Sequence, residues 1–381
     1  MPIPSKKSSL KISEEEEENG ITEALIPGLP NDVAELCLLR VPYPYQTLVR
    51  SVSASWNKAI THPGFLLSKK NLSLSLPFIF VFAFKKSTAR MQWQALDPRS
   101  GRWFVLPSMP LPNDDVSLSP SSFACASLPR HGKLFVLGGM RSDTCSPMQS
   151  TVVYHASTNQ WSEATPMLSP RSYFEAGEIN GEIFAVGGSD ATGEAITSVE
   201  RYDHVTDTWK ASAKLPAALA RYSSAVVGGK LCVTEGWTWP FMFSPRGSTY
   251  DPDSDTWREM KAGMREGWTG VSVVVGDRLL VISEHGDCPM KVYNPDEDTW
   301  QYVEGEKFPC DALRRPFSAI GLDGLIYVVS SGLYVGIGKL YVDVGEGLGK
   351  KGITVKVEWQ VVPAPNAFRG FAPSSCQLLY A

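Results

Sequence analysis

The chain has 381 residues, of which 43% are hydrophobic and 10% aromatic, enough for a large buried core. Its net charge of −4 and isoelectric point near 5.8 exclude the strongly basic surface typical of nucleic-acid-binding proteins. No apolar run reaches the ~20 residues of a membrane-spanning helix, and no signal peptide is expected. Seven cysteines without a CxxC pair favour a reducing compartment, so we expect the protein in the nucleus and cytoplasm.

The amino-terminal part divides into two segments of different character. Residues 1–22 are rich in Ser, Lys and Glu, and we expect them to be disordered and acidic. Residues 23–68 carry the only strong helical pattern. A first helix is expected after Pro30, capped by Asn31 or Asp32. Pro42 and Pro44 should end it, and a second helix should place four apolar side chains at intervals of four residues: Leu48, Val52, Trp56 and Ile60. The run His62-Pro63-Gly64 is expected to stop this second helix.

From about residue 76 to residue 381 the sequence reads as short β-strands in repeated units. Each unit has an apolar strand, often ending in two glycines, then a tyrosine, a turn rich in Asp, Asn and Pro, and a tryptophan. A period of roughly 50 residues made of strands predicts a β-propeller. The recurring tryptophans are Trp103, Trp161, Trp209, Trp257, Trp300 and Trp359.

Counting strands predicts six blades, of which the first is incomplete. It has strands only at about 78–84, 91–96 and 103–106. We expect its fourth strand to come from residues 375–380, so that the carboxyl end closes the ring and leaves no open sheet edge.

The ordered repeat of strand, Gly-Gly, Tyr and Trp resembles the kelch repeat, and the helical segment resembles an F-box. The fold class is therefore expected to be mainly β, a six-bladed kelch propeller over residues 76–381 preceded by a small helical F-box. The match to an F-box departs from the family pattern between Pro42 and Gln46. By this resemblance, a Skp-type adaptor, and through it a cullin, would bind the F-box residues that match the motif: Leu29, Pro30, Leu36, Leu39, Leu48, Val52 and Trp56.

The resemblance implies a substrate-recognition subunit of an SCF-type ubiquitin ligase that is not itself an enzyme and needs no cofactor or metal. Loops after the second and fourth strand of each blade share one face in kelch propellers, and a target protein would bind there. The candidate residues on that face are Trp237, Trp239, Phe241, Phe243, Arg171, Arg221, Trp268, His285 and Arg315. The aromatic loop over 237–243 either anchors the target or plugs the central channel. The arginines either meet the target, form a solvated rim or make hydrogen bonds between blades.

Three runs are also similar to a plant F-box/kelch protein, which implies a role in phytochrome A and far-red light signalling: 235–243, 265–270 and 283–287. Two other functions stay open. One is a kelch scaffold without a ligase role, and the other is a propeller enzyme or small-ligand receptor. The identity of the target does not follow from the sequence.

Overall fold

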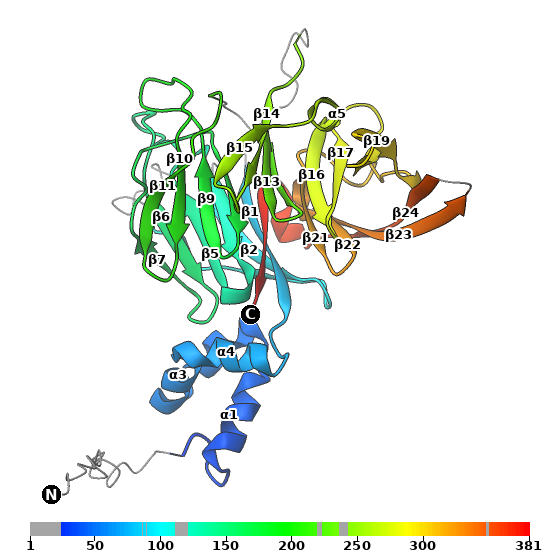
Figure 1. The fold of residues 1–381 in the computed structure, drawn as a ribbon. Coiled ribbons are helices and arrows are strands. Elements are labelled where there is room, and N and C mark those ends of the chain that lie inside the picture. Colours follow the sequence, from blue (N-terminus) through cyan, green and yellow to red (C-terminus); the bar gives the residue numbers. More distant parts are fainter. Residues whose placement is uncertain are drawn as a thin grey trace, which may run out of the picture.

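The computed structural model describes residues 24–85, 87–88, 90–110, 121–218, 223–235, 243–347 and 350–381. The expected disorder of residues 1–22 lies outside these ranges. The described strands form six antiparallel sheets arranged as the blades of a propeller, which confirms the predicted fold class (Figure 1). Between residue 24 and the first strand the structure describes four helices, at the end of the propeller where the carboxyl terminus also lies.

Each blade runs from an inner strand that lines the central channel to an outer strand that carries the repeat tryptophan. Blades two to five follow the chain in order. Blade two consists of β4 (Ala124–Leu128), β5 (Lys133–Leu137), β6 (Thr151–His155) and β7 (Gln160–Ala164), and blade three of β8 (Glu175–Ile179), β9 (Glu182–Val186), β10 (Val199–Asp203) and β11 (Thr208–Ser212). Blade four consists of β12 (Ser223–Val227), β13 (Lys230–Thr234), β14 (Gly247–Asp251) and β15 (Thr256–Glu259). Blade five consists of β16 (Gly270–Val275), β17 (Arg278–Ser283), β18 (Met290–Asn294) and β19 (Thr299–Tyr302).

The first blade is completed from the carboxyl end, as predicted. Strand β25 (Phe371–Tyr380) is its inner strand and pairs with β1 (Pro77–Lys85), which is followed by β2 (Arg90–Asp97) and β3 (Arg102–Val105). The register joins Pro77 to Tyr380 and Lys85 to Phe371, so the whole inner edge of β1 is hydrogen-bonded. The ring is closed by non-covalent pairing between the two ends of the propeller sequence.

The sixth blade has one strand more than the expected four. Its strands are β21 (Ser318–Leu322), β22 (Leu325–Val329), β23 (Val335–Gly347) and β24 (Lys350–Val362), with the two-residue β20 (Glu304–Gly305) added in parallel at the outer edge. Strands β23 and β24 are 13 residues long each and extend well beyond the blade as a hairpin (Figure 1).

The recurring turn and tryptophan have a common structural role. In blades two to five the tyrosine hydroxyl donates to the side chain of an Asn or Asp five residues later, at 2.5–2.8 Å, and that residue has a positive φ near 50°. Asn and Asp tolerate this left-handed conformation better than other residues that carry a Cβ. The tryptophan indole then donates to a carbonyl in the connection that precedes its own blade, as Trp209 does to Thr165 at 2.9 Å. The repeat residues therefore hold the blade together, as their periodicity suggested.

The helical segment differs from the expectation in its boundaries. Helix α1 (Asn31–Leu39) begins after Pro30 without a side-chain cap, because the Asn31 side chain instead accepts a hydrogen bond from the Leu25 amide. The predicted second helix is two helices, α2 (Tyr43–Val49) and α3 (Ala54–Thr61), because the Ser53 hydroxyl caps a new helix start.

Two further helices were not predicted from the sequence. Pro63 stands in the first turn of α4 (Pro63–Asn71), where its missing N–H has no cost, so His62-Pro63-Gly64 starts a helix as well as ending one. The short α5 (Ala262–Gly267) lies at the other end of the propeller, between β15 and β16.

The helices contact the propeller through the segment between Pro42 and Gln46, where the sequence departs from the F-box pattern. The Tyr43 ring lies in the aromatic core of blades one and two, 5.0 Å from the Phe78 ring, and its hydroxyl bonds that of Tyr154. Nearby, the buried Lys69 ammonium donates to the Val41 carbonyl at 3.2 Å, and burial lowers the pKa of Lys69 to about 8. The Lys69 bond joins α4 to the segment before α2, whereas the contacts of Tyr43 fix the helices on the propeller, at the face formed by the turns between first and second and between third and fourth strands.

Candidate binding surfaces

The F-box helices expose apolar side chains that the propeller does not cover. Leu48 is 66% and Val52 62% exposed, although both are large hydrophobic residues in or beside a helix. Leu29, Val33 and Leu36 are each about 40% exposed, and Pro30 is exposed as well. Several large apolar side chains exposed on one small domain are characteristic of a protein-binding site.

Two of the predicted adaptor-binding residues lie inside the helical unit. Leu39 is buried with Leu38, Ile60 and Phe65 in the small core between α1, α3 and α4. The half-buried Trp56 donates its indole N–H to the Leu25 carbonyl and packs on the same core. Their position suits them to shape the F-box, and contact with an adaptor stays a prediction for all seven residues.

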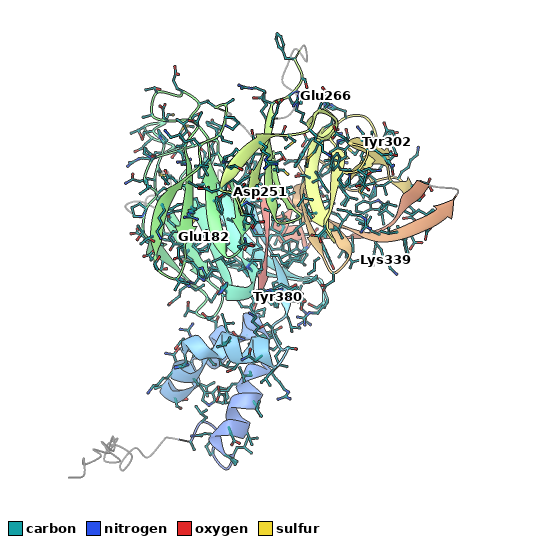
Figure 2. All side chains as sticks on the ribbon, in the orientation of Figure 1. Glu182, Asp251, Glu266, Tyr302, Lys339 and Tyr380 are labelled. Carbon is teal, nitrogen blue, oxygen red and sulfur yellow. The ribbon has the colours of Figure 1, made fainter. Side chains whose placement is uncertain are left out.

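The loops predicted to bind a target gather at the end of the propeller opposite the F-box. In Figure 2, Glu266 on the connection between blades four and five lies at that end, and Tyr380 at the end near the helices. Because antiparallel strands alternate in direction, second and fourth strands both end towards this far face, and the described parts of the connections that follow them lie there. The predicted adaptor-binding and target-binding residues that the structure describes therefore lie at opposite ends of the molecule.

The structure brings two of the predicted target-binding residues together. Arg315 donates from Nη2 to the Cys288 Sγ at 3.1 Å, and its Nη2 lies 3.5 Å from the Gly286 carbonyl oxygen. This places its guanidinium against the loop that carries His285, and both residues are exposed. His285 and Arg315 form one polar patch on the connections of blade five.

Two other predicted residues are buried and act within the fold. Arg171 is 0% exposed, and its guanidinium donates to the Glu200 carboxylate at 2.5 Å and to the Gly187 and Ser198 carbonyls at 3.0 Å. Trp268 is 2% exposed and donates from its indole to the Ser223 hydroxyl at 3.2 Å. Both side chains are buried in the fold. The guanidinium of Arg171 bonds blade three, and its backbone N–H donates to the Met148 carbonyl of blade two, so the residue joins the two blades.

The remaining predicted residues lie mostly outside the described ranges, namely Arg221, Trp237, Trp239 and Phe241. Phe243, at the edge of the aromatic loop, is described and is 82% exposed. The neighbouring Ser244 hydroxyl donates to the Glu266 carboxylate at 2.9 Å, which ties this end of the loop to α5. Phe243 therefore does not plug the channel.

Two pockets on the sixth blade add residues that sequence reasoning missed. One, of about 580 Å³, lies between the connections at the far face and is lined by Arg314, Tyr334, Asn366 and Arg369 among others. The second, of about 690 Å³, lies between blades five and six beside the loop of His285. Arg314 stood next to a predicted residue, whereas Tyr334, Asn366 and Arg369 could have been found only as non-repeating loop positions.

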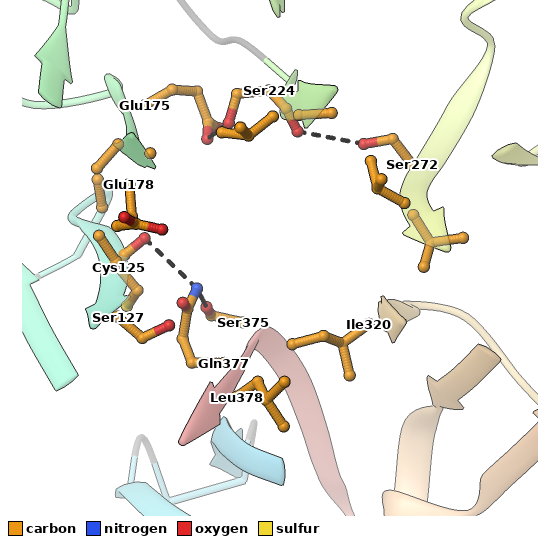
Figure 3. Close-up of a pocket in the computed structure, with 18 of the residues that line it drawn as sticks. Cys125, Ser127, Glu175, Glu178, Ser224, Ser272, Ile320, Ser375, Gln377 and Leu378 are labelled. Atoms are coloured by element: carbon orange, nitrogen blue, oxygen red, sulfur yellow. Dashed lines mark hydrogen bonds between the residues drawn. The ribbon is translucent and has the colours of Figure 1, made fainter. Parts of the chain in front are cut away.

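The central channel forms a further pocket of about 570 Å³, lined by the inner strands of all six blades (Figure 3). Glu175 of β8 accepts a hydrogen bond from the Ser224 hydroxyl of the next blade at 2.8 Å. Burial raises the pKa of Glu175 to about 7, and the hydrogen bond from Ser224 partly opposes this increase. On the other side, Gln377 of β25 donates to the Cys125 carbonyl at 3.4 Å, so hydrogen bonds in the channel join neighbouring blades.

Within the described residues, no group of three His, Cys, Asp or Glu side chains is arranged to hold a metal ion. The helices in those ranges are all too short or too polar to cross a membrane. All seven cysteines are free thiols.

The chain combines a small helical unit that exposes apolar side chains with a six-bladed β-propeller. Residues 124–168 and 170–216 match the family model for the Kelch motif. The chain is 56% identical over 367 residues to the F-box protein AFR of Arabidopsis thaliana, covering 96% of this chain and 95% of that protein. It is 38% identical over 360 residues to the F-box/kelch-repeat protein At1g30090 of the same plant, covering 94% of this chain and 87% of the relative. The chain belongs to the F-box/kelch-repeat family.

Proposed function

We propose that the protein is a non-catalytic substrate receptor of an SCF-type ubiquitin ligase. In this role the F-box binds a Skp-type adaptor, which joins it to a cullin, and the far face of the propeller holds a target protein. Ubiquitin transfer is then carried out by other subunits, and the receptor raises the effective concentration of the target's lysines near them. The observation that carries the proposal is the uncovered apolar surface of Leu29, Leu36, Leu48 and Val52 on helices docked away from the recognition face.

The docking of the helices supports a rigid relation between the two surfaces. Tyr43, Tyr154 and the aromatic core around them join the F-box to blades one and two without a long linker. A rigid receptor presents a bound target in a restricted orientation, which reduces the entropic cost of bringing its lysines to the transfer site.

The adaptor interaction is tested with the full chain and a purified Skp-type adaptor in a pull-down and by calorimetry. Replacing Leu48 and Val52 with Asp should abolish 1:1 binding, because the charges would be buried in an apolar interface. Val205, an 80% exposed apolar residue on the propeller, offers the matched control, and Val205→Asp should bind as the wild type does. Folded wild-type protein that does not bind the adaptor would contradict the proposal and leave a kelch scaffold.

By its similarity to AFR we further propose a role in phytochrome A and far-red light signalling, with the protein in the nucleus and cytoplasm. Plant lines that lack the protein should respond more weakly to continuous far-red light, measured as hypocotyl length. The wild-type chain should restore the response, whereas the Leu48→Asp/Val52→Asp variant should not. A fluorescent fusion in the same lines tests the location.

A further inference from the structure

Neighbouring blades are joined at three successive interfaces by the same aromatic pair. In each case a phenylalanine on the second strand of one blade packs on the tyrosine of the third strand in the next blade, with ring centroids 5.0–5.7 Å apart. The pairs are Phe80 with Tyr154, Phe135 with Tyr202 and Phe184 with Tyr250. Rings at this separation fill the space between two sheets.

The fourth interface has the tyrosine but lacks the phenylalanine. Cys232 pairs with Thr249 across β13 and β14, at the register position where Phe184 pairs with Arg201 in the blade before. The small Cys232 side chain packs towards Tyr293 of blade five. A side chain that lacks the ring leaves space between blades four and five.

A pocket of about 700 Å³ opens at this place. Apolar and aromatic groups form its inner part, including Cys232, Met264, Leu279, Val292 and Tyr293. This volume is within the range of small-molecule sites, about 300–1,000 Å³. A ring of the size of the missing phenylalanine would fill the part of the pocket beside Cys232 and Tyr293 and leave room for a polar group attached to that ring.

Basic side chains surround the apolar part. Four basic side chains line the pocket: Lys230, Arg258, Lys261 and Arg278. The acidic Glu259, Asp277 and Asp296 line it as well. Lys230 is paired with Asp251 at 2.8 Å, Lys261 donates to the Pro295 carbonyl at 2.9 Å, and Glu259 is paired with Arg265.

The two remaining guanidinium groups are the candidates for binding a ligand. Within the described part of the chain, the side chains of Arg258 and Arg278 make no hydrogen bond or ion pair, although the charge of Arg258 helps to lower the pKa of Asp251. A guanidinium presents a planar set of donors that matches a carboxylate.

We propose that the pocket between blades four and five is a binding site for a small aromatic carboxylate. Its ring occupies the place of the missing phenylalanine against Cys232 and Tyr293, and its carboxylate faces Arg258 and Arg278. The site lies between the two blades, with Cys232 and Leu279 on their second strands and Met264 on α5 among its lining residues. None of the residues that line it comes from the F-box. The inference does not depend on the ligase role.

The test uses 2-naphthoate as the probe and calorimetry or ligand-observed NMR on the full chain. Wild type should bind one equivalent saturably, and the neutral 2-naphthamide should bind more weakly. Cys232→Phe restores the ring found in blades two and three, and it should abolish binding. Arg258→Gln should weaken 2-naphthoate about tenfold, the loss expected for one charge-assisted hydrogen bond, and leave 2-naphthamide unchanged.

Two controls distinguish a loss of binding at this pocket from a loss of folding and from binding in the central channel. Cys232→Phe should melt at the same or a higher temperature than wild type, because its ring fills existing space, and Cys232→Leu should bind the probe more weakly without loss of folding. Glu175→Gln, in the central channel, should bind 2-naphthoate as the wild type does. Three results would overturn the proposal. The wild type could bind no probe, binding could be lost in Glu175→Gln but not in Cys232→Phe, or both Cys232 variants could be strongly destabilised.

Discussion

Replacement of Arg171 by methionine should destabilise the propeller severely, although the sequence alone made this residue a candidate for target binding. Its guanidinium is buried and makes five hydrogen bonds, which join the connection before blade three to β9 and β10. The Glu200 carboxylate would stay buried, 3% exposed, with the Leu168 amide as a remaining donor at 2.7 Å. Removal of one partner from such a pair costs about 3–5 kcal/mol, because the other charge is left uncompensated in a medium of low polarity.

Urea unfolding followed by tryptophan fluorescence measures this loss as a shift of the midpoint at unchanged slope. The double variant Arg171→Met/Glu200→Met should recover at least half of it, because no unpaired charge remains. Arg141→Met removes an ion pair with Asp143 that is largely exposed, and it should change the midpoint little. A loss below about 1 kcal/mol for Arg171→Met, or no recovery in the double variant, would refute the reasoning.

Three further predictions concern ring closure, domain docking and acid stability. A chain that ends at Gly370 lacks β25 and should aggregate in size-exclusion chromatography, because the inner edge of β1 is left open; a peptide of residues 371–381 should partly restore the monomer. Tyr43→Ala should speed proteolysis between F-box and propeller, whereas Leu36→Ala, at an exposed side chain of α1, should not. Hydrogen bonds from Tyr250, and to a smaller extent from Ser212, hold the pKa of Asp255 below its usual value. The ionised Asp255 therefore stabilises the folded protein at pH values above the unfolded-state pKa, and this stabilisation is lost as pH falls through the folded-state pKa. The urea midpoint of Asp255→Asn should therefore lie below that of wild type at pH 7 and approach it near pH 3; a constant difference would contradict this explanation.

The family pattern identified the F-box but gave the wrong meaning to two of its features. From the sequence, the departure from the F-box pattern at Tyr43 to Tyr45 suggests a distorted helix start. In the structure, Tyr43 is the residue that docks the helices on the propeller. The four-residue spacing from Leu48 to Ile60 continues across a break between two helices. Periodicity reports which side chains share a face, and it does not report the capping hydroxyl of Ser53 that starts a new helix.

The sequence by itself determined the six blades, their closure by the last strand and the helical F-box. These depend on patterns that are local or periodic, such as the tyrosine, the turn with positive φ and the tryptophan in each blade. Only the tertiary structure decided which of the candidate side chains are available to a partner. Arg171 and His285 look alike as polar loop residues, and one is buried while the other is exposed. The pocket at Cys232 is likewise invisible in the chain, because a missing ring leaves space only where two blades meet.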